Sequence, residues 1–231
     1  MIWYFLVVFM DELQKINIIF EDNHLLVVEK PINMPVCEDD SHDKDLLNLL
    51  KEYIKVKYNK PGNVYLGLVH RLDRPVGGVM VFAKTSKAAS RLSKQVSEHK
   101  LNKVYLAVVE EKTPESGNFL DYLIKDSKKN QSYVTDKAHG KDARLSFKRL
   151  GYKEGFSLVE IHLETGRSHQ IRVQFSSRGF PLVGDAKYNK NHDGKTNVAL
   201  FAKELAFEHP ISKDILTFKA NIPNRYPFNL F

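Results

Sequence analysis

A series of short segments with strand character constrains the fold of this chain most strongly. Two of them, Leu145-Ser-Phe-Lys-Arg-Leu150 and Leu158-Val-Glu-Ile-His-Leu163, alternate apolar and polar residues. That alternation is typical of antiparallel strands with one buried face. On this pattern and on apolar runs of similar length, we predict strands over residues 24–29, 79–84, 104–110, 143–150, 156–164, 198–207 and 215–219.

Three segments between these strands carry apolar residues at helical spacing. They predict helices over residues 45–58, 86–99 and 168–178, the second capped by Ser86 and the third ended by Gly179. Antiparallel strands combined with segregated helices predict an α+β fold. Because no Pro-, Gly- or Ser-rich linker divides the chain, we expect a single domain. Its mostly antiparallel mixed central β-sheet would be flanked by helices and loops.

The composition limits the compartment and the kind of site. Cys37 is the single cysteine among 231 residues, which excludes an internal disulfide framework and a multi-cysteine zinc site. A reducing, cytoplasmic setting fits. Residues 1–10 are wholly apolar, but they reach only half the length of a membrane span and lack the features of a signal peptide. We expect this leader to be a misassigned start upstream of Met10 or a leading strand, without membrane association.

Positive charge is concentrated after the first fifty residues. Residues 1–50 hold ten acidic side chains against three lysines, a net charge of −7, and the whole chain carries +7. Residues 51–231 therefore carry +14. A surface this basic favours a polyanionic partner, above all nucleic acid, with solubility alone as the alternative.

The segment from Gly67 to Gly78 places Asp73 beside His70, Arg71 and Arg74. A carboxylate among cations stays ionised and can attack an electrophilic carbon. The two arginines suit a phosphate or a planar base. A surface ion-pair cluster that caps a turn is the alternative interpretation.

A second cluster, residues 164–174, begins where a predicted strand ends. Arg167 and Arg172 are five residues apart, so on a helix they do not quite share a face. One is then free for a phosphate while the other turns toward a buried carboxylate. By its reference pKa, His169 is a candidate general base. A solvated basic helix start is the alternative.

Neither a metal nor a nucleotide cofactor is expected. The histidines form no His-x-x-x-His or Glu-x-x-His pair with a plausible third ligand, and Gly77-Gly78 lacks the spacing of a phosphate-binding loop. Between the two clusters, Tyr105 lies in an alternating strand. It is either a packed sheet aromatic or a ring that stacks on a base and moves a proton.

Four segments, in this order, resemble the RluA-type pseudouridine synthases. The resemblance covers nearly the whole chain and rests on residues 22–35 with Lys30-Pro31, His70-Arg-Leu-Asp73, Lys103-Val-Tyr105-Leu-Ala-Val, and residues 165–172 with their extension to Tyr188. Two positions depart from the family pattern. Val76-Gly77-Gly78 stands in place of Thr-Ser-Gly but keeps the glycine that the turn needs. Gln174 replaces a frequent histidine, and we expect this to change a peripheral contact.

The resemblance implies that the chain isomerises a uridine within RNA. Asp73 would attack the ribose C1′ or, in an alternative route, take a proton from the sugar. Arg172 aligns with the arginine that forms a salt bridge to this carboxylate. Tyr105 would stack on the base and help to remove the C5 proton, and Arg71 would fill the space left by the extruded uridine.

The implied partner is tRNA or ribosomal RNA, bound in part by Arg167 and His169, and no cofactor is required. The first motif starts by residue 22, so we expect a monomeric, cytoplasmic catalytic domain over residues 11–231 without an S4-like RNA-binding domain. Two alternatives stay open. One is a noncatalytic RNA-binding relative, in which Asp73 merely anchors Arg172. The other is a nucleoside glycosidase-like hydrolase, although no second acid accompanies Asp73.

Overall fold

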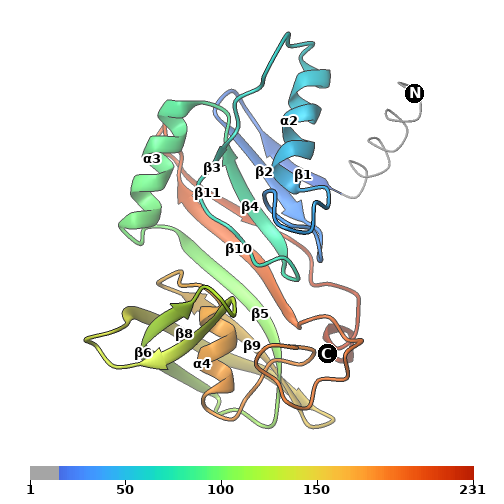
Figure 1. The fold of residues 1–231 in the computed structure, drawn as a ribbon, viewed down its shortest axis with the longest axis vertical. Coiled ribbons are helices and arrows are strands. Elements are labelled where there is room, and N and C mark those ends of the chain that lie inside the picture. Colours follow the sequence, from blue (N-terminus) through green and yellow to red (C-terminus); the bar gives the residue numbers. More distant parts are fainter. Residues whose placement is uncertain (1–15) are drawn as a thin grey trace. The chain divides into compact units, whose positions relative to one another are not determined.

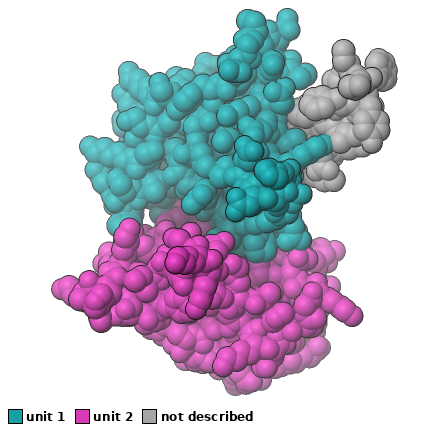
Figure 2. All heavy atoms as spheres, in the orientation of Figure 1, with its two compact units in different colours: residues 1–101, 205–220 teal, residues 102–204, 221–231 magenta. Residues whose placement is uncertain are grey.

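The computed structural model describes residues 16–231, and over this range the α+β prediction is confirmed. The described residues contain eleven strands of a mostly antiparallel sheet and three α-helices (Figure 1). They separate into two compact units, residues 16–101 with 205–220 and residues 102–204 with 221–231 (Figure 2). The expected leader over residues 1–10 lies outside the described range. A single catalytic domain over 11–231 stays a prediction.

The first unit is built around strand β4, whose seven residues are all buried. β4 pairs antiparallel with β2 and with the short β3, β2 pairs with β1, and β11 pairs with β10. The strands wholly within this unit are β1 (Asn17–Glu21), β2 (Leu25–Lys30), β3 (Gly67–Leu68), β4 (Gly77–Ala83) and β11 (Ile215–Lys219). Strand β10 (Leu200–Glu208) belongs to this unit from Leu205 onward, and its first five residues belong to the second unit. Helix α3 (Ser86–Ser97) packs on β4, and its Leu92 joins Val79, Val81 and Phe207 in the apolar core.

The two helices of this unit begin at capping side chains. Helix α2 (Leu46–Lys57) is capped by Asp45, which accepts a hydrogen bond from the Asn48 backbone N–H. Helix α3 (Ser86–Ser97) is capped by Thr85, not by the predicted Ser86. Thr85 is extended, as a capping residue must be, while Ser86 already has helical geometry. No helix in residues 16–231 is long and apolar enough to cross a membrane.

The second unit contains a five-stranded antiparallel sheet in the order β5-β9-β8-β6-β7. Its strands are β5 (Asn102–Glu110), β6 (Ser116–Asp126), β7 (Gln131–Thr135), β8 (Lys141–Lys153) and β9 (Phe156–Leu163). Helix α4 (Gln170–Ser176) packs on this sheet. Phe119, Phe147 and Phe175 join the helix to β6 and β8, with ring centroids 4.9–5.3 Å apart.

Four strands were not among those predicted, and helix α4 is shorter than expected. β6 and β7 carry apolar side chains at exposed positions, among them Leu120, Ile124 and Val134, so their residues do not alternate between an apolar and a polar face. The predicted helix over 168–178 loses its first residues because His169 adopts a left-handed conformation, with φ 54°. Gly179, with φ +82°, follows the end of the helix as predicted.

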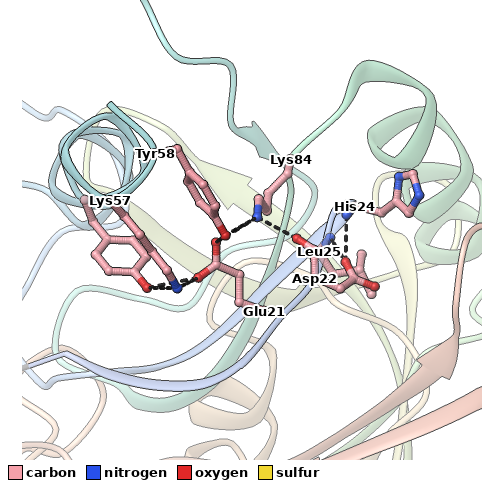
Figure 3. A network of polar contacts seen from close by, with 8 residues as sticks. Glu21, Asp22, His24, Leu25, Lys57, Tyr58 and Lys84 are labelled. Atoms are coloured by element: carbon pink, nitrogen blue, oxygen red, sulfur yellow. Dashed lines mark hydrogen bonds and ion pairs between the residues drawn. The ribbon is translucent and has the colours of Figure 1, made fainter. Parts of the chain in front are cut away.

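A buried carboxylate ties helix α2 to the sheet of the first unit (Figure 3). The Glu21 side chain is 7% exposed and accepts hydrogen bonds from Tyr53, Lys57, Tyr58 and Lys84 at 2.6–2.9 Å. Burial by itself raises the Glu21 pKa. The hydrogen bonds from these lysines and tyrosines outweigh it and lower the pKa to about 2.

This network predicts a loss of stability in acid. Because the folded-state pKa of Glu21 lies below its unfolded value, its contribution is complete above about pH 4.5 and is lost as the pH falls toward 2. We expect Glu21→Gln to lower the free energy of unfolding at pH 7 by about 1–2 kcal/mol. The variant should also flatten the dependence of this free energy on pH between 4.5 and 2, measured by urea titration.

Glu29→Gln is the matched control, because Glu29 lies on the neighbouring strand and accepts from the neutral Asn17 amide. Equal pH dependence of unfolding for the Glu21→Gln and wild-type proteins would contradict the assigned role of the network.

Candidate active site

The loop between β3 and β4 carries the predicted catalytic aspartate. Asp73 is half-buried, and its carbonyl oxygen accepts a hydrogen bond from the Val76 N–H at 2.9 Å, which closes a tight turn. Before the turn, Nε2 of His70 accepts from the Val81 N–H at 3.1 Å and anchors the loop on β4. Arg71 is exposed. The histidine of this cluster therefore shapes the loop, while the arginine next to it faces solvent.

A buried lysine holds the same turn through hydrogen bonds to backbone carbonyl oxygens. Lys30 is 1% exposed, and its Nζ donates to the carbonyl oxygens of Pro31, Arg74 and Val76 at 2.8–2.9 Å. The pKa of Lys30 is lowered to about 7, chiefly by burial; attraction to Asp73 opposes this lowering, and the positive charge of Arg74 adds to it. Lys30 thus holds the backbone that follows Asp73 and acts electrostatically on its carboxylate.

The glycines after the turn are required by this packing. A Cβ at Gly77 would lie 3.0 Å from the Lys30 carbonyl oxygen and 3.1 Å from a methyl carbon of Ile32. Gly78 has φ +121°, which side chains rarely allow. The prediction that the turn needs glycine at this place is therefore confirmed.

Arg74 pairs with acidic side chains of a neighbouring loop. Its guanidinium hydrogen-bonds to Asp43 and to the Ser41 hydroxyl, and lies 3.6 Å from Asp39. These acidic side chains are about half exposed. For Arg74, the ion-pair interpretation of the cluster is the one that the contacts support.

In the second unit, Tyr105 lies on β5 opposite Ile161 and is 9% exposed. Lys103 is two residues earlier on the same strand, so its side chain leaves the same face of the sheet. Its Nζ donates to the Thr165 carbonyl oxygen at 3.3 Å. The tyrosine strand is thus joined directly to the turn that begins the second cluster.

That turn is built from side-chain hydrogen bonds. Thr165 is fully buried; its Oγ1 accepts from the Arg144 N–H at 2.8 Å and donates to Oε1 of Gln170 at 2.8 Å. Gln170 also accepts from the Arg167 N–H at 3.0 Å. Nε of Arg167 donates to the Asp142 carbonyl oxygen at 2.8 Å. Arg167 therefore lies in a hydrogen-bonded turn before α4, outside the helix.

Arg172 faces a buried carboxylate, Asp185. Its Nε and Nη2 donate to the two carboxylate oxygens at 2.7 Å each, and the side chains are 5% and 0% exposed. The Arg172 guanidinium also lies 5.2 Å from the centre of the Tyr188 ring. Oη of Tyr188 lies 2.8 Å from Nδ1 of His169 and accepts from the Ser132 N–H at 2.7 Å. Arg172 and His169 thus both contact Tyr188.

Gln174 is fully buried, which corrects the expectation of a peripheral contact. Its Nε2 donates to Asp121 at 2.7 Å and to the Ala143 carbonyl oxygen at 3.2 Å. It therefore ties α4 to β6 and β8. The position at which the family often has histidine is therefore one where this helix packs on the sheet.

The residue constellation and the fold can now be compared with known proteins. Residues 24–177 match the family model described as RNA pseudouridylate synthase. The chain belongs to the RNA pseudouridylate synthase family. It is thus an RNA pseudouridine synthase, an isomerase whose substrate is RNA, and the predicted family and enzyme class are confirmed.

Curated relatives agree with this assignment, and a solved structure agrees with the fold. The ribosomal large subunit pseudouridine synthase D of Zymomonas mobilis is 34% identical, and the match covers 90% of this chain and 69% of the relative. The uncharacterized RNA pseudouridine synthase YlyB of Bacillus subtilis is 35% identical over the same shares of the two chains. Human RNA pseudouridylate synthase domain containing 4 shares the fold, with a TM-score of 0.81 and 21% identity over 98% of this chain and 96% of that chain.

The predicted site residues of this synthase divide between the units. Asp73 and Arg71 belong to the first, and Tyr105, Arg167, His169 and Arg172 to the second. The pairing of Arg172 with Asp73 stays a prediction, as do the roles of Arg71, Arg167 and His169 in RNA binding.

Three supporting residues escaped the sequence analysis. Lys30 stands in the Lys-Pro pair of the first motif, and Asp185 and Tyr188 stand in the extension of the last motif. All three lay within segments quoted for the family resemblance. Charge was the available signal for Lys30 and Asp185, since lysine and aspartate are rarely buried unless they are paired.

Proposed function

We propose that this synthase converts specific uridines in structured RNA to pseudouridine, with Asp73 as the catalytic carboxylate. The position of Asp73 carries the proposal: a half-buried carboxylate on a turn whose backbone accepts hydrogen bonds from Lys30. A group held this way loses little freedom when it meets its substrate. The reaction needs this group as a carboxylate, and Lys30 interacts with it electrostatically.

The isomerisation breaks the bond between N1 of uracil and C1′ of ribose and forms a bond between C5 and C1′. N1 gains a proton and C5 loses one, so no oxidant, reductant or cofactor is consumed. Asp73 either attacks C1′ directly or takes a proton from the sugar. Tyr105 stacks on the base and helps to remove the C5 proton, and Arg172 orients the carboxylate.

The target uridine must leave its stack before these groups reach it. Arg71, which is exposed beside Asp73 in the chain, occupies the vacated space in the RNA. Arg167 and His169 contact the surrounding RNA. The substrate is ribosomal RNA or tRNA, and the relatives named for the large ribosomal subunit favour ribosomal RNA. The enzyme acts as a cytoplasmic monomer.

The test is conversion of unmodified transcripts. Large-subunit ribosomal RNA and a tRNA pool are incubated with purified enzyme, and pseudouridines are mapped by carbodiimide labelling and primer extension. We expect conversion at a small number of uridines in one of the two substrates. The same positions should lose the modification in cells without the gene. RNA binding without conversion in either substrate would favour the noncatalytic alternative, and release of free uracil would favour the hydrolase.

A further inference from the structure

The start of β5 and the turn before α4 bring two cations together. Nζ of Lys103 lies 3.3 Å from the Thr165 carbonyl oxygen, and Arg167 follows two residues later on the same turn. Between them, Gly166 is exposed and has no side chain to cover the amine: a Cβ there would lie 3.5 Å from Nζ. The Lys103 side chain is thus partly buried, and its amine is left uncovered next to Gly166.

Within residues 16–231, neither cation of this pair forms an ion pair with a carboxylate. The guanidinium of Arg167 is oriented by a backbone carbonyl, that of Asp142, at 2.8 Å. The acidic groups on the adjoining segments are already used, because Arg144 lies 3.1 Å from the Asp142 carboxylate and 3.6 Å from that of Glu164. Two positive groups side by side without an anion are unfavourable, and an anion between them would relieve both.

The pKa of Lys103 reflects the same imbalance. Burial, and to a smaller extent the positive charge of Arg167, lowers it to about 8. An anion bound at Gly166 would stabilise the charged amine and raise this pKa again.

The strand geometry relates this site to the base-stacking tyrosine. Lys103 and Tyr105 leave the same face of β5, two residues apart, which corresponds to about 6.6 Å along the strand. A base stacked on Tyr105 would therefore have its neighbouring backbone phosphate within reach of Lys103.

We propose that Lys103 and Arg167 together bind one phosphodiester group of the substrate RNA, next to the uridine that stacks on Tyr105. The proposal rests on the proposed function for the position of the base. The binding itself is tested without turnover, so it does not depend on Asp73. Lys103 is then a binding residue for the RNA backbone that recognises no particular base.

The experiment measures the dissociation constant of a large-subunit ribosomal RNA transcript as a function of salt and pH. We expect Lys103→Met to weaken binding about tenfold at pH 7 and to reduce the slope of log K against log salt by about one. Arg167→Met should do the same. Lys94→Met is the control, because this exposed lysine of α3 already pairs with Glu98, and it should leave the affinity and the slope close to the wild-type values.

Lys103→Arg separates charge from structure, because arginine stays protonated at pH 9. It should bind like the wild type at pH 7 and keep its affinity at pH 9, where the wild type loses affinity as Lys103 deprotonates. This comparison also holds if the methionine variant fails to fold, which thermal unfolding would reveal.

Two outcomes would overturn the proposal. The first is an unchanged dissociation constant and salt slope for folded Lys103→Met. The second is a lower rate at saturating RNA with unchanged affinity, which would place Lys103 in the chemical steps. Failure of the proposed function would look different: no variant or wild-type protein would form pseudouridine, whatever its affinity for RNA.

Discussion

The Asp73→Asn enzyme is expected to lose conversion of uridine to pseudouridine by about a thousandfold or more while it keeps its affinity for RNA. Asparagine has nearly the same shape as aspartate, so the turn supported by Lys30 remains. Its amide neither attacks C1′ nor accepts a proton from the sugar. Losses of this size are usual when the group that performs the chemistry is removed. Single-turnover conversion and filter binding measure the two effects separately.

Asp40→Asn is the matched control for this variant, because it removes one exposed carboxylate from the neighbouring acidic loop. It should convert uridine at close to the wild-type rate. Turnover of Asp73→Asn near the wild-type rate would exclude Asp73 as the catalytic carboxylate. A parallel loss of folding, detected by thermal unfolding, would assign the aspartate to the structure of the loop.

The second large effect is expected at the ion pair between Arg172 and Asp185. Asp185→Asn leaves the buried guanidinium without its carboxylate, and breaking such a pair from one side costs about 3–5 kcal/mol of stability. Asp185 also accepts from the N–H groups of Lys187 and Tyr188 at 3.0 and 3.3 Å, so the loop below Arg172 loosens as well. Denaturant titration gives the change in the free energy of unfolding.

A double-mutant cycle isolates the pair. Arg172→Met removes the cation, and we expect the double variant to be more stable than the sum of the single changes predicts, by at least about 1 kcal/mol. Asp142→Asn is the control, because its pair with Arg144 is nearly half exposed and should contribute about 1 kcal/mol or less. Additive effects of Arg172→Met and Asp185→Asn would show that the two side chains act independently.

Activity separates the roles of this pair. If Arg172 orients the catalytic carboxylate, Arg172→Met and Asp185→Asn lower kcat and kcat/KM together. A change confined to KM would assign Arg172 to RNA binding instead. The kinetic constants of both variants are measured below the temperature at which the less stable variant begins to unfold.

The amino-acid pattern was informative where one face of an element is buried. The alternating residues of β8 and β9 predicted both strands to within a few residues, because the period of two follows directly from a sheet with one apolar face. The same reasoning failed for β6 and β7, whose exposed positions also carry apolar side chains such as Leu120 and Val134. It also failed at the start of α4, where His169 is left-handed and its side chain contacts Tyr188, nineteen residues away.

The sequence by itself determined the family, the reaction class and the candidate aspartate, because these reside in short segments whose residue types and order are visible in one dimension. Only the tertiary structure decided what surrounds these segments. It placed Lys30 under the Asp73 turn, Asp185 against Arg172, and Lys103 beside Arg167. The partners in these contacts are between 13 and 64 residues apart, as in the 44 residues between Lys30 and Arg74. The chain spacing carries no sign of such pairs, because burial and the demand of buried polar groups for partners arise only when the strands are assembled.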